Sequence, residues 1–336
     1  MRYNFGMRKK KLNIVIPAAG EGRRLKPLTH TTPKALLAVA GKPIIAHIVE
    51  RIADLKPERI VVVTGSNQGG RVEQYLTATF QLPFFFAEQK NPLGLGDAVY
   101  RAKEYLDPDA SCLIILGDTI LDMNFSDLLR EDNLVGVKRV SDPRRFGIVE
   151  LRNGVIGRIV EKPQEPKSDL AIVGVYYFNE TSPLFQALEK IITKNIKTKG
   201  EFQLSDALEL LIEEGLVIKA YPVEYWLDCG TPEALIETNR YLLQSNNYFK
   251  ERKGSVIIPP VYIADSAKIE ESVIGPFVSV SEEAEICRSI IKDSIINAGA
   301  IVENSLLTET ILGENAVIKE KPLRLNLGDF SVMESH

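Results

Sequence analysis

The last quarter of the chain carries an apolar repeat that few folds can accommodate. An isoleucine, valine or leucine recurs every five or six positions, at Ile263, Ile269, Ile274, Val280, Ile286, Ile291, Ile296, Val302, Leu307, Leu312 and Ile318. Amphipathic helices place apolar residues roughly every three or four positions, so this spacing argues against them. With alanines interleaved, it is the hexapeptide rhythm of a parallel β-helix. A run of ordinary antiparallel strands is the alternative, and the length of the repeat favours the β-helix.

The first part of the chain alternates between strand-like and helix-like segments. Apolar runs take turns with helical patterns, and these segments are 12–18, 43–55, 59–65, 69–76, 95–106 and 111–118. Continuous apolar strands alternating with helices are typical of a parallel sheet that is covered by helices on both faces. We therefore predict an α/β fold for this part.

Strand patterns dominate from about residue 135. Asn153 and Gly154 separate two of these strands and predict a tight hairpin turn. Helices are expected at about 182–194 and 203–214. Thr231 is the expected N-cap of a last helix, because Pro232 then occupies the first helical position.

Composition and length place limits on the class of protein. The chain has 336 residues, 45% of them hydrophobic, which suggests about two domains with ample core. A net charge of −4 argues against general nucleic-acid binding, and three cysteines without paired spacing indicate neither a disulfide framework nor a zinc site. Because we find neither a membrane-length apolar run nor a signal-peptide pattern, we expect a cytoplasmic protein without a membrane partner. The predicted domains are a basic arm at 1–11, an α/β domain at 12–246 and a β-helix at 247–330.

The segment PAAGEGRRLKP, residues 17–27, follows the first predicted strand and combines glycines with cations. Glycines let backbone N–H groups approach an anion, and arginine offers paired donors to phosphate oxygens. The segment lacks a P-loop signature, and Leu25 replaces the third glycine of a dinucleotide fingerprint. A polyphosphate ligand explains the pattern, and a solvated basic loop is the alternative.

The longer stretch 17–34, PAAGEGRRLKPLTHTTPK, resembles the signature loop of sugar-1-phosphate nucleotidylyltransferases, G-x-G-x-R-x-x-P-x-T followed by P-K. Further motifs of that family follow in order, and they are EQKNPLGLGDAV, LGD, FGIVE, EKPQEPKSDLAIVG, GEFQLSDAL and WLDCGTPEAL. With the hexapeptide tail and the closing LRLNLGDF, the chain is most similar to long-form glucose-1-phosphate thymidylyltransferases, from about Leu12 to Phe330. The resemblance implies a Rossmann-like nucleotidyltransferase domain with a mixed, mostly parallel sheet, followed by a short left-handed parallel β-helix.

The resemblance also implies a reaction. A sugar 1-phosphate, here glucose 1-phosphate, attacks the α-phosphorus of dTTP, and dTDP-glucose and pyrophosphate are formed. By the same resemblance, Asp118 and Asp228 bind Mg²⁺. Arg24 stabilises the triphosphate, Lys34 reaches the phosphates, and Lys162 binds the sugar phosphate. As isolated residues, the two aspartates could equally be turn or cap residues, and the lysines could be solvent-exposed loop residues.

Other positions match the family's substrate contacts. The residues that match nucleotide-binding positions are Ala19, Gly20, Gly22, Gln89, Gly94 and Asp118. The residues that match sugar-binding positions are Gly147, Glu161, Lys162, Gly174 and Trp226. Two positions depart from the pattern, since Asp97 stands where many relatives carry Gln or His and Cys229 where thymidylyl enzymes often carry Thr. Both departures bear on the choice of nucleotide or sugar.

Three other functions are compatible with parts of this pattern. The first is UDP-glucose formation from UTP, because uracil and thymine differ by one methyl group. Acyl transfer, the second, is common among β-helices of hexapeptide repeats but generally needs a histidine base, and residues 247–330 contain no histidine. The third is a non-catalytic regulatory subunit, which would tend to lose a signature Arg, Lys or carboxylate. We expect a homo-oligomer, because a short β-helix leaves apolar faces that need covering.

Overall fold

The computed structural model describes residues 11–66 and 69–321 of the chain. The predicted basic arm, except for Lys11, and the closing LRLNLGDF motif lie outside the described residues. Contacts divide the chain into two compact units, Met1–Leu37 with Lys42–Thr238, and Ala38–Gly41 with Asn239–His336. This division assigns residues 239–246 to the second unit, whereas the composition-based boundary between 246 and 247 stays a prediction.

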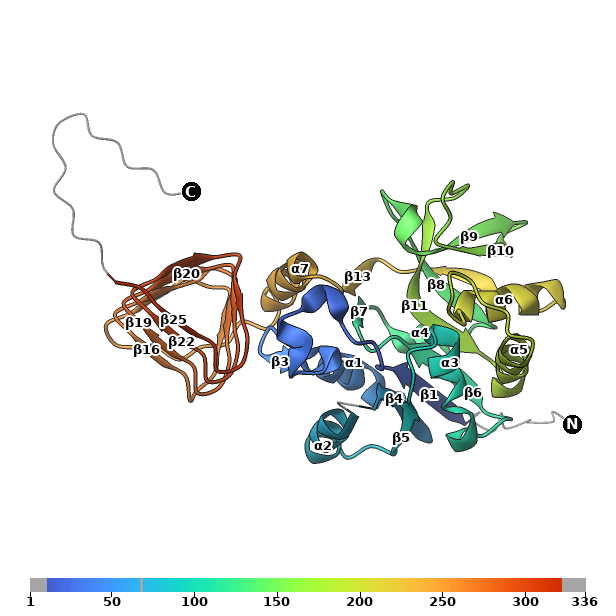
Figure 1. Cartoon of the computed structure of the whole chain (residues 1–336), viewed down its shortest axis with the longest axis horizontal. Coiled ribbons are helices and arrows are strands. Elements are labelled where there is room, and N and C mark those ends of the chain that lie inside the picture. Colours follow the sequence, from blue (N-terminus) through green and yellow to red (C-terminus); the bar gives the residue numbers. More distant parts are fainter. Residues whose placement is uncertain (1–10, 67–68, 322–336) are drawn as a thin grey trace, which may run out of the picture. The chain divides into compact units, whose positions relative to one another are not determined.

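The first unit is built on a nine-stranded mixed sheet (Figure 1). Its main path runs β10-β9-β11-β6-β1-β4-β5, with β8 paired to β11 and β12 paired to β8. Strands β1, β4, β5 and β6 are parallel, whereas β11 runs antiparallel to β6, β8 and β9. The bounds are β1 (Leu12–Pro17), β4 (Arg59–Gly65), β5 (Phe84–Gln89), β6 (Ser111–Ile115), β8 (Leu134–Arg139), β9 (Gly147–Arg152), β10 (Val155–Glu161), β11 (Leu170–Phe178) and β12 (Lys219–Pro222).

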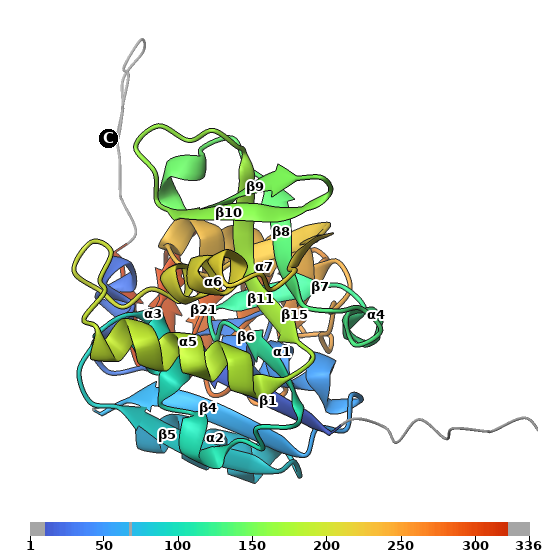
Figure 2. The same ribbon diagram turned by 90° about the vertical axis from the view of Figure 1, so that its right-hand side faces the viewer.

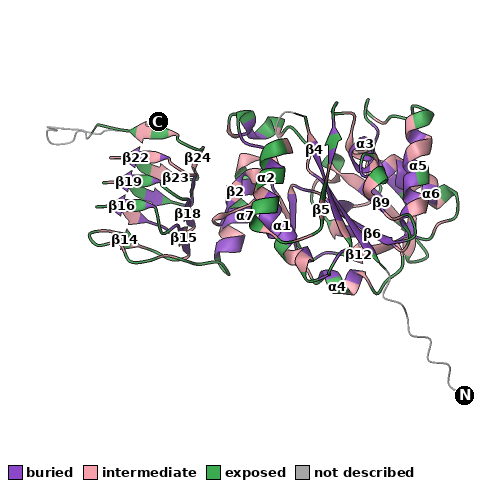
Figure 3. Cartoon of the chain, turned by 90° about the horizontal axis from the view of Figure 1, so that it is seen from below, coloured by how far each residue is buried: buried purple, intermediate pink, exposed green. Residues whose placement is uncertain are grey.

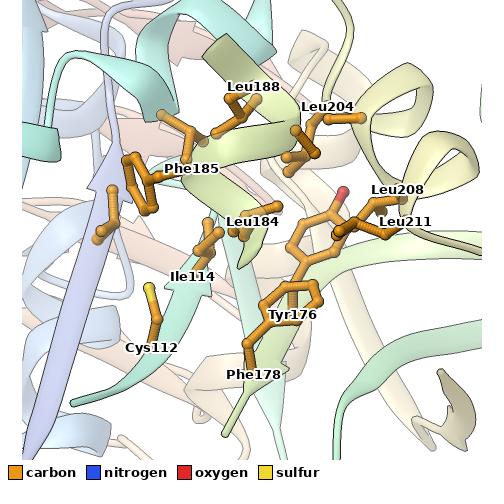
Figure 4. Close-up of a cluster of buried hydrophobic side chains, with 14 of the residues drawn as sticks. Cys112, Ile114, Tyr176, Phe178, Leu184, Phe185, Leu188, Leu204, Leu208 and Leu211 are labelled. Carbon is orange, nitrogen blue, oxygen red and sulfur yellow. The ribbon is translucent and has the colours of Figure 1, made fainter. Parts of the chain in front are cut away.

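Helices lie on both sides of this sheet, as the apolar strands predict. Side chains from α3, α5 and α6 pack with strand residues in one core cluster, part of which Figure 4 shows around Tyr176 and Leu184. Figure 3 shows α1 and α2 on the opposite side of the strands, and Figure 2 shows α5 and α6 lying across the sheet. The bounds are α1 (Ile44–Ala53), α2 (Gly69–Thr79), α3 (Leu95–Tyr100), α4 (Phe125–Leu128), α5 (Thr181–Thr193), α6 (Leu204–Glu213) and α7 (Pro232–Leu243).

Short elements complete this part of the chain. The two-residue strands are β2 (Ala38–Val39) and β3 (Lys42–Pro43). Strands β7 (Thr119–Asp122) and β13 (Tyr225–Asp228) form a separate antiparallel pair. The 3₁₀ turns are η1 (Arg23–Leu25), η2 (Leu28–His30), η3 (Lys34–Leu36), η4 (Lys103–Tyr105) and η5 (Pro143–Arg145).

The predicted hairpin turn and the predicted N-cap are both present, whereas the length of one predicted helix is wrong. Asn153 (φ 52°) and Gly154 (φ 83°) turn the β9–β10 hairpin with the positive φ angles that a type I′ turn requires. Thr231 Oγ1 accepts a hydrogen bond from Ala234 N at 3.3 Å, as an N-cap does. The helix predicted at 95–106 is wrong in its length, because Ala102 N donates to Val99 O and the α-helix tightens into the 3₁₀ turn η4.

The second unit contains a left-handed parallel β-helix with three walls of four parallel strands each. The predicted apolar positions line its interior, where eight of the residues of the repeat or their alanine neighbours are fully enclosed, including Ile274, Ile291 and Val302. The repeat prediction is therefore confirmed. The strands are β14 (Val256–Ile257), β15 (Val261–Ile263), β16 (Lys268–Glu270), β17 (Val273–Ile274), β18 (Val278–Val280), β19 (Glu285–Cys287), β20 (Ile290–Lys292), β21 (Ile295–Ile296), β22 (Ile301–Glu303), β23 (Leu306–Thr308), β24 (Ile311–Leu312) and β25 (Val317–Lys319).

Within the described ranges, none of the helices has the length and apolar character needed to cross a membrane.

Candidate active site

The glycine-rich segment after β1 forms a tight loop that leads into η1. Gly22 adopts a left-handed backbone (φ 61°), and a Cβ at this position would come within 2.8 Å of Thr29 Cγ2. Thr29 Oγ1 donates to Gly22 O at 2.8 Å, and Leu25 is fully buried beneath the loop. A residue other than glycine would therefore disturb the loop, which is held from below and presents its cations to the surroundings.

This loop borders a hollow of about 380 Å³ at the carboxyl ends of β1, β5 and β6. We call it the loop hollow. All six residues predicted to bind nucleotide line it, together with Lys34, and they are Ala19, Gly20, Gly22, Gln89, Gly94 and Asp118. Ligands of open α/β sheets bind at this edge, outside the carboxyl ends of the strands.

A second hollow, of about 300 Å³, lies beside the β9–β10 hairpin, and we call it the hairpin hollow. All predicted sugar-binding residues line it, as do Arg24 and both carboxylates, so that the set is Arg24, Asp118, Gly147, Glu161, Lys162, Gly174, Trp226 and Asp228. Asp118 lines both hollows, and so do Leu95, Leu116 and Glu201. The two hollows therefore adjoin at Asp118.

The two predicted metal ligands are brought together by the β7–β13 pair. Asp118 precedes β7, and Asp228 ends β13 opposite Thr119. Cys229 N donates to Asp118 O at 3.1 Å, which ties the two segments together. Burial raises the pKa of Asp228 above its ordinary value, and the negative charge of Asp118 raises it further, against the opposing effect of Lys34, Arg24 and Arg145.

Cations surround this carboxylate pair. Lys34 Nζ donates to Asp118 Oδ2 at 2.5 Å. Gly230 leaves room for Arg24 beside Asp228, because a Cβ on Gly230 would lie 2.9 Å from Arg24 Nη2 and 3.0 Å from Asp228 Oδ1. The lysine and the arginine thus approach the pair from the glycine-rich segment and its continuation.

The donor set at the junction fits a hard divalent cation. Within the described part of the chain, no group of three or more His, Cys, Asp or Glu side chains could hold a metal. Two carboxylates are nevertheless the usual protein contribution to a magnesium site, where substrate phosphates and water supply the other oxygens. Burial, and to a smaller extent the charge of Asp118, raise the pKa of Asp228 and so disfavour its ionised form, which a bound cation would favour.

On the side of the hairpin, Glu161 is held in place by three neighbours. Ser205 Oγ donates to Glu161 Oε2 at 2.8 Å, and Lys162 Nζ lies 3.2 Å from Glu161 Oε1. Gly147 is paired with Glu161 in the hairpin, and a Cβ there would lie 3.0 Å from Glu161 Oε2. The carboxylate is thus oriented at the wall of the hairpin hollow, and the glycine leaves space next to it.

Two other predicted residues of this hollow have distinctive settings. Gly174 has φ 85°, and a Cβ there would come within 2.7 Å of Leu116 Cδ1, so only glycine fits. Trp226 packs edge-on against Phe146, with ring centroids 4.9 Å apart. The buried indole Nε1 of Trp226 has no hydrogen-bond partner among the described residues.

Sequence reasoning missed several residues that line the hollows. Arg145 and Ser205 line the hairpin hollow, and Glu201 lines both hollows. Arg145 comes from η5, before the hairpin, and Ser205 from the first turn of α6. Glu201 and Ser205 lie inside the recognised GEFQLSDAL motif, which was the available signal, whereas Arg145 had none apart from its place next to FGIVE.

A glycine-rich cationic loop and a carboxylate pair at the carboxyl edge of an α/β sheet are typical of a domain that binds phosphate groups. The chain belongs to the family described as nucleotidyl transferase, whose sequence model matches residues 13–245.

Individual relatives extend this likeness. The chain is 32% identical to a glucose-1-phosphate thymidylyltransferase of Streptomyces antibioticus, over 96% of this chain and 99% of the relative. It is 33% identical to the UTP–glucose-1-phosphate uridylyltransferase AglF of Haloferax volcanii, over 71% of this chain and all of the relative. Among solved structures, a UDP-glucose pyrophosphorylase complexed with UDP-glucose superposes with a TM-score of 0.60 at 25% identity, covering 70% of this chain and 99% of that one.

Proposed function

We propose that this chain transfers a thymidylyl group from dTTP to glucose 1-phosphate, with dTDP-glucose and pyrophosphate as products. The observation that carries the proposal is the junction at Asp118. A hollow lined by the expected nucleotide contacts meets there a hollow lined by the expected sugar contacts. The full-length likeness to a thymidylyltransferase supports the choice of dTTP and glucose 1-phosphate.

The reaction balances without a covalent protein intermediate. An oxygen of the sugar phosphate attacks the α-phosphorus of the nucleotide in line, the bond between the α-phosphorus and the bridging oxygen to the β-phosphate breaks, and pyrophosphate leaves. Such phosphoryl-type transfers depend mostly on positioning and on neutralising the charge of the phosphates. The cations and carboxylates around Asp118 are suited to both tasks.

Three cations have separate roles in this proposal. Arg24 stabilises the triphosphate and the charge that develops on departing pyrophosphate. Lys34 contacts the phosphates from the loop side, since its ammonium lies against Asp118 at the junction. Lys162 holds the phosphate of the sugar, because it lies beside Glu161 on the wall of the hairpin hollow.

Asp118 and Asp228 would hold Mg²⁺ in this proposal. When bound, the ion neutralises phosphate charge and helps to orient the two substrates. The two aspartates contribute negative charge on their own, which would repel a triphosphate, so the ion pair of Lys34 with Asp118 and the nearby charge of Arg24 keep the junction suited to anions.

The remaining predicted residues recognise the two substrates. Gln89 reads the edge of the base and Gly94 lets the backbone approach it. Glu161 accepts hydrogen bonds from sugar hydroxyls, while Gly147 and Gly174 leave room for close approach of the sugar. Trp226 offers an aromatic surface to the same substrate.

UTP is the second candidate nucleotide, favoured by the likeness to a uridylyltransferase over the whole of that relative. One methyl group distinguishes the bases, and a pocket discriminates one such group by only about 1–3 kcal/mol. The reaction class is the same for both nucleotides.

The proposal is tested by measuring pyrophosphate release from dTTP, UTP, CTP, ATP and GTP, each combined with several sugar 1-phosphates in the presence of Mg²⁺. We expect the highest kcat/KM for dTTP with glucose 1-phosphate. A higher value for UTP would select the second candidate. Absence of pyrophosphate release for all combinations would overturn the proposal of catalysis.

A further inference from the structure

Gln89, at the end of β5, has both of its hydrogen-bond interactions on the same atom. Gln89 Nε2 donates to Gly94 O at 2.9 Å and to Asp97 Oδ2 at 2.8 Å. A carbonyl oxygen and a carboxylate can only accept, so the amide nitrogen must face these two partners. The orientation of the amide is therefore fixed by the chemistry of its neighbours.

Asp97 is held as an acceptor by its own surroundings. Its side chain is only 1% exposed, in the first turn of α3. Arg101 Nη2, one helical turn later, donates to the other carboxylate oxygen, Asp97 Oδ1, at 2.5 Å. Because Arg101 can only donate, it keeps Asp97 Oδ1 as an acceptor and leaves Oδ2 to receive the Gln89 amide.

The carbonyl oxygen of the Gln89 side chain, Oε1, takes no part in these hydrogen bonds. Among the described residues, no group donates a hydrogen bond to it, although Gln89 is 93% removed from solvent, being 7% exposed, and lines the loop hollow. Gly94, which accepts from the same amide, has φ 115°, and a Cβ there would lie 2.5 Å from Phe202 O. The backbone at this point therefore cannot easily rearrange to offer Gln89 another partner.

We propose that Asp97 is a positioning residue that locks Gln89 with its carbonyl oxygen toward the nucleobase, so that the loop hollow selects pyrimidines with a ring N–H over cytosine. This inference rests on the proposed function, in which Gln89 reads the base. Uracil and thymine carry a hydrogen on N3 and can donate it to Gln89 Oε1. Cytosine carries a lone pair at N3, so it would place an acceptor against an acceptor.

The size of the effect follows from the cost of an unmade hydrogen bond in a buried site. Leaving such a group unpaired typically changes an equilibrium by on the order of ten- to a hundredfold. The same lock explains no preference between thymine and uracil, since both carry the N3 hydrogen. It separates both of them from cytosine.

Replacing Asp97 by asparagine tests the lock, because Asp97→Asn preserves shape but adds a donor. Arg101 retains the oxygen of the new amide, so the amide nitrogen faces Gln89, and Gln89 turns its oxygen away from the hollow. We expect the preference for dTTP over dCTP to fall by roughly ten- to a hundredfold. Asp97→Ala, which removes the acceptor altogether, is expected to lower the same ratio, and it serves as the second variant should the first fail to fold.

Arg101→Met is the matched control. It breaks the same ion pair but leaves Asp97 Oδ2 as an acceptor for Gln89, while water reaches the exposed side of Arg101, whose side chain is 44% exposed. We expect this variant to keep the dTTP to dCTP ratio within about twofold, well below the effect of a lost hydrogen bond. A merely structural role of the ion pair would instead make Arg101→Met and Asp97→Asn behave alike.

The measurement is calorimetric Kd for dTTP and dCTP with the full chain and each variant, with pyrophosphate release and thermal unfolding recorded in parallel. A ratio unchanged in folded Asp97→Asn or Asp97→Ala, or equal tightness of dTTP and dCTP in the unaltered protein, overturns the inference. If the Kd ratios change as expected but no pyrophosphate forms with any sugar 1-phosphate, the lock stands and the proposed catalysis fails. If pyrophosphate forms normally but the Kd ratios of the variants do not change, the proposed catalysis stands and the lock fails.

Discussion

The ammonium of Lys34 donates to Oδ2 of Asp118 at 2.5 Å, at the point where the loop hollow and the hairpin hollow adjoin. The lysine comes from η3 and the aspartate from the turn after β6, so the contact joins segments that are 84 residues apart. A lysine and an aspartate in this relationship form a polar centre that can accept an anion on one side and a cation on the other.

The first prediction concerns the carboxylates at this centre. Asp118→Ala and Asp228→Ala are each expected to lower kcat/KM by at least about a hundredfold while leaving the fold intact, because each removes half of the protein's contribution to the cation site. Asp142→Asn is the control, since Asp142 lies outside both hollows and pairs with exposed Arg144. Titration of Mg²⁺ into each variant gives the measurement, and full turnover by either alanine variant would contradict the assignment.

The second prediction concerns Arg24. Arg24→Ala is expected to lower kcat by ~10²–10³ with a much smaller effect on the KM for glucose 1-phosphate, because charge on departing pyrophosphate develops in the transition state. Arg144→Ala serves as the control, since Arg144 is an exposed arginine outside both hollows. Steady-state kinetics with both substrates varied decide the matter. A change confined to KM would indicate that Arg24 binds the ground state only.

Most of the fold could be predicted from the sequence, because the patterns that indicate it are periodic or local. The five-to-six-residue spacing of apolar residues such as Ile274 and Ile291 can be read without knowing any contact, and both residues are fully buried in the β-helix. The α/β alternation is equally local. The premature end of the helix after Tyr100 was missed, because it depends on how the following turn packs.

The site was predictable only where residues fall into continuous motifs. Asp118 and Asp228 were assigned because the motifs LGD and WLDCG that contain them resemble those of the family, and their role in binding metal stays a prediction. Arg145 and Gly230 were missed as parts of the site, because their proximity to Asp228 is produced by tertiary packing of η5 and of the segment after β13. The contact of Asp97 with Gln89 also spans two elements, and only the structure shows which atom of the amide it fixes.

The third prediction concerns the carboxylate of Asp206. Asp206 in α6 has a buried Oδ2 without a hydrogen-bond partner among the described residues. Burial raises the pKa of Asp206, and the charge of Glu161 raises it further. An acid whose pKa is raised by folding binds its proton more tightly when folded, so it lowers stability as pH rises from its ordinary value through the raised one.

Asp206→Asn should therefore raise Tm relative to the unaltered protein at pH 7, and this gain should shrink as pH falls toward the ordinary value of 3.8. Thermal unfolding of both proteins over a range of pH gives the measurement. A gain that is independent of pH would show that charge is not its cause, and a loss of Tm at pH 7 would contradict the prediction outright.

The fourth prediction concerns assembly through the β-helix. Strands β14, β17, β20 and β23 form one wall, and successive residues in its outward column are paired in register, namely Val256, Val273, Ile290 and Leu306. Leu306 is 76% exposed and Val256 is 57% exposed. We propose that a second copy of the chain covers this column, because a continuous aliphatic ladder on a flat sheet is self-complementary.

Leu306→Lys is then expected to shift the protein toward smaller species in sedimentation, while kcat/KM changes little because both hollows are lined by residues before Cys229. Lys268→Ala, on the charged wall that contains β16 and β19, is the control and should leave assembly unchanged. A monomeric unaltered protein, or a Leu306→Lys variant with the original sedimentation coefficient, would contradict the proposal.

The central claim is that the phosphate of the sugar becomes attached to the α-phosphorus of the nucleotide at the junction of the two hollows. Glucose 1-phosphate labelled with ¹⁸O in its non-bridging phosphate oxygens tests this directly, with mass spectrometry of both products after incubation with dTTP and Mg²⁺. The account predicts that all of the label is retained in dTDP-glucose and that the released pyrophosphate is unlabelled. Label in the pyrophosphate, or in inorganic phosphate, would contradict it.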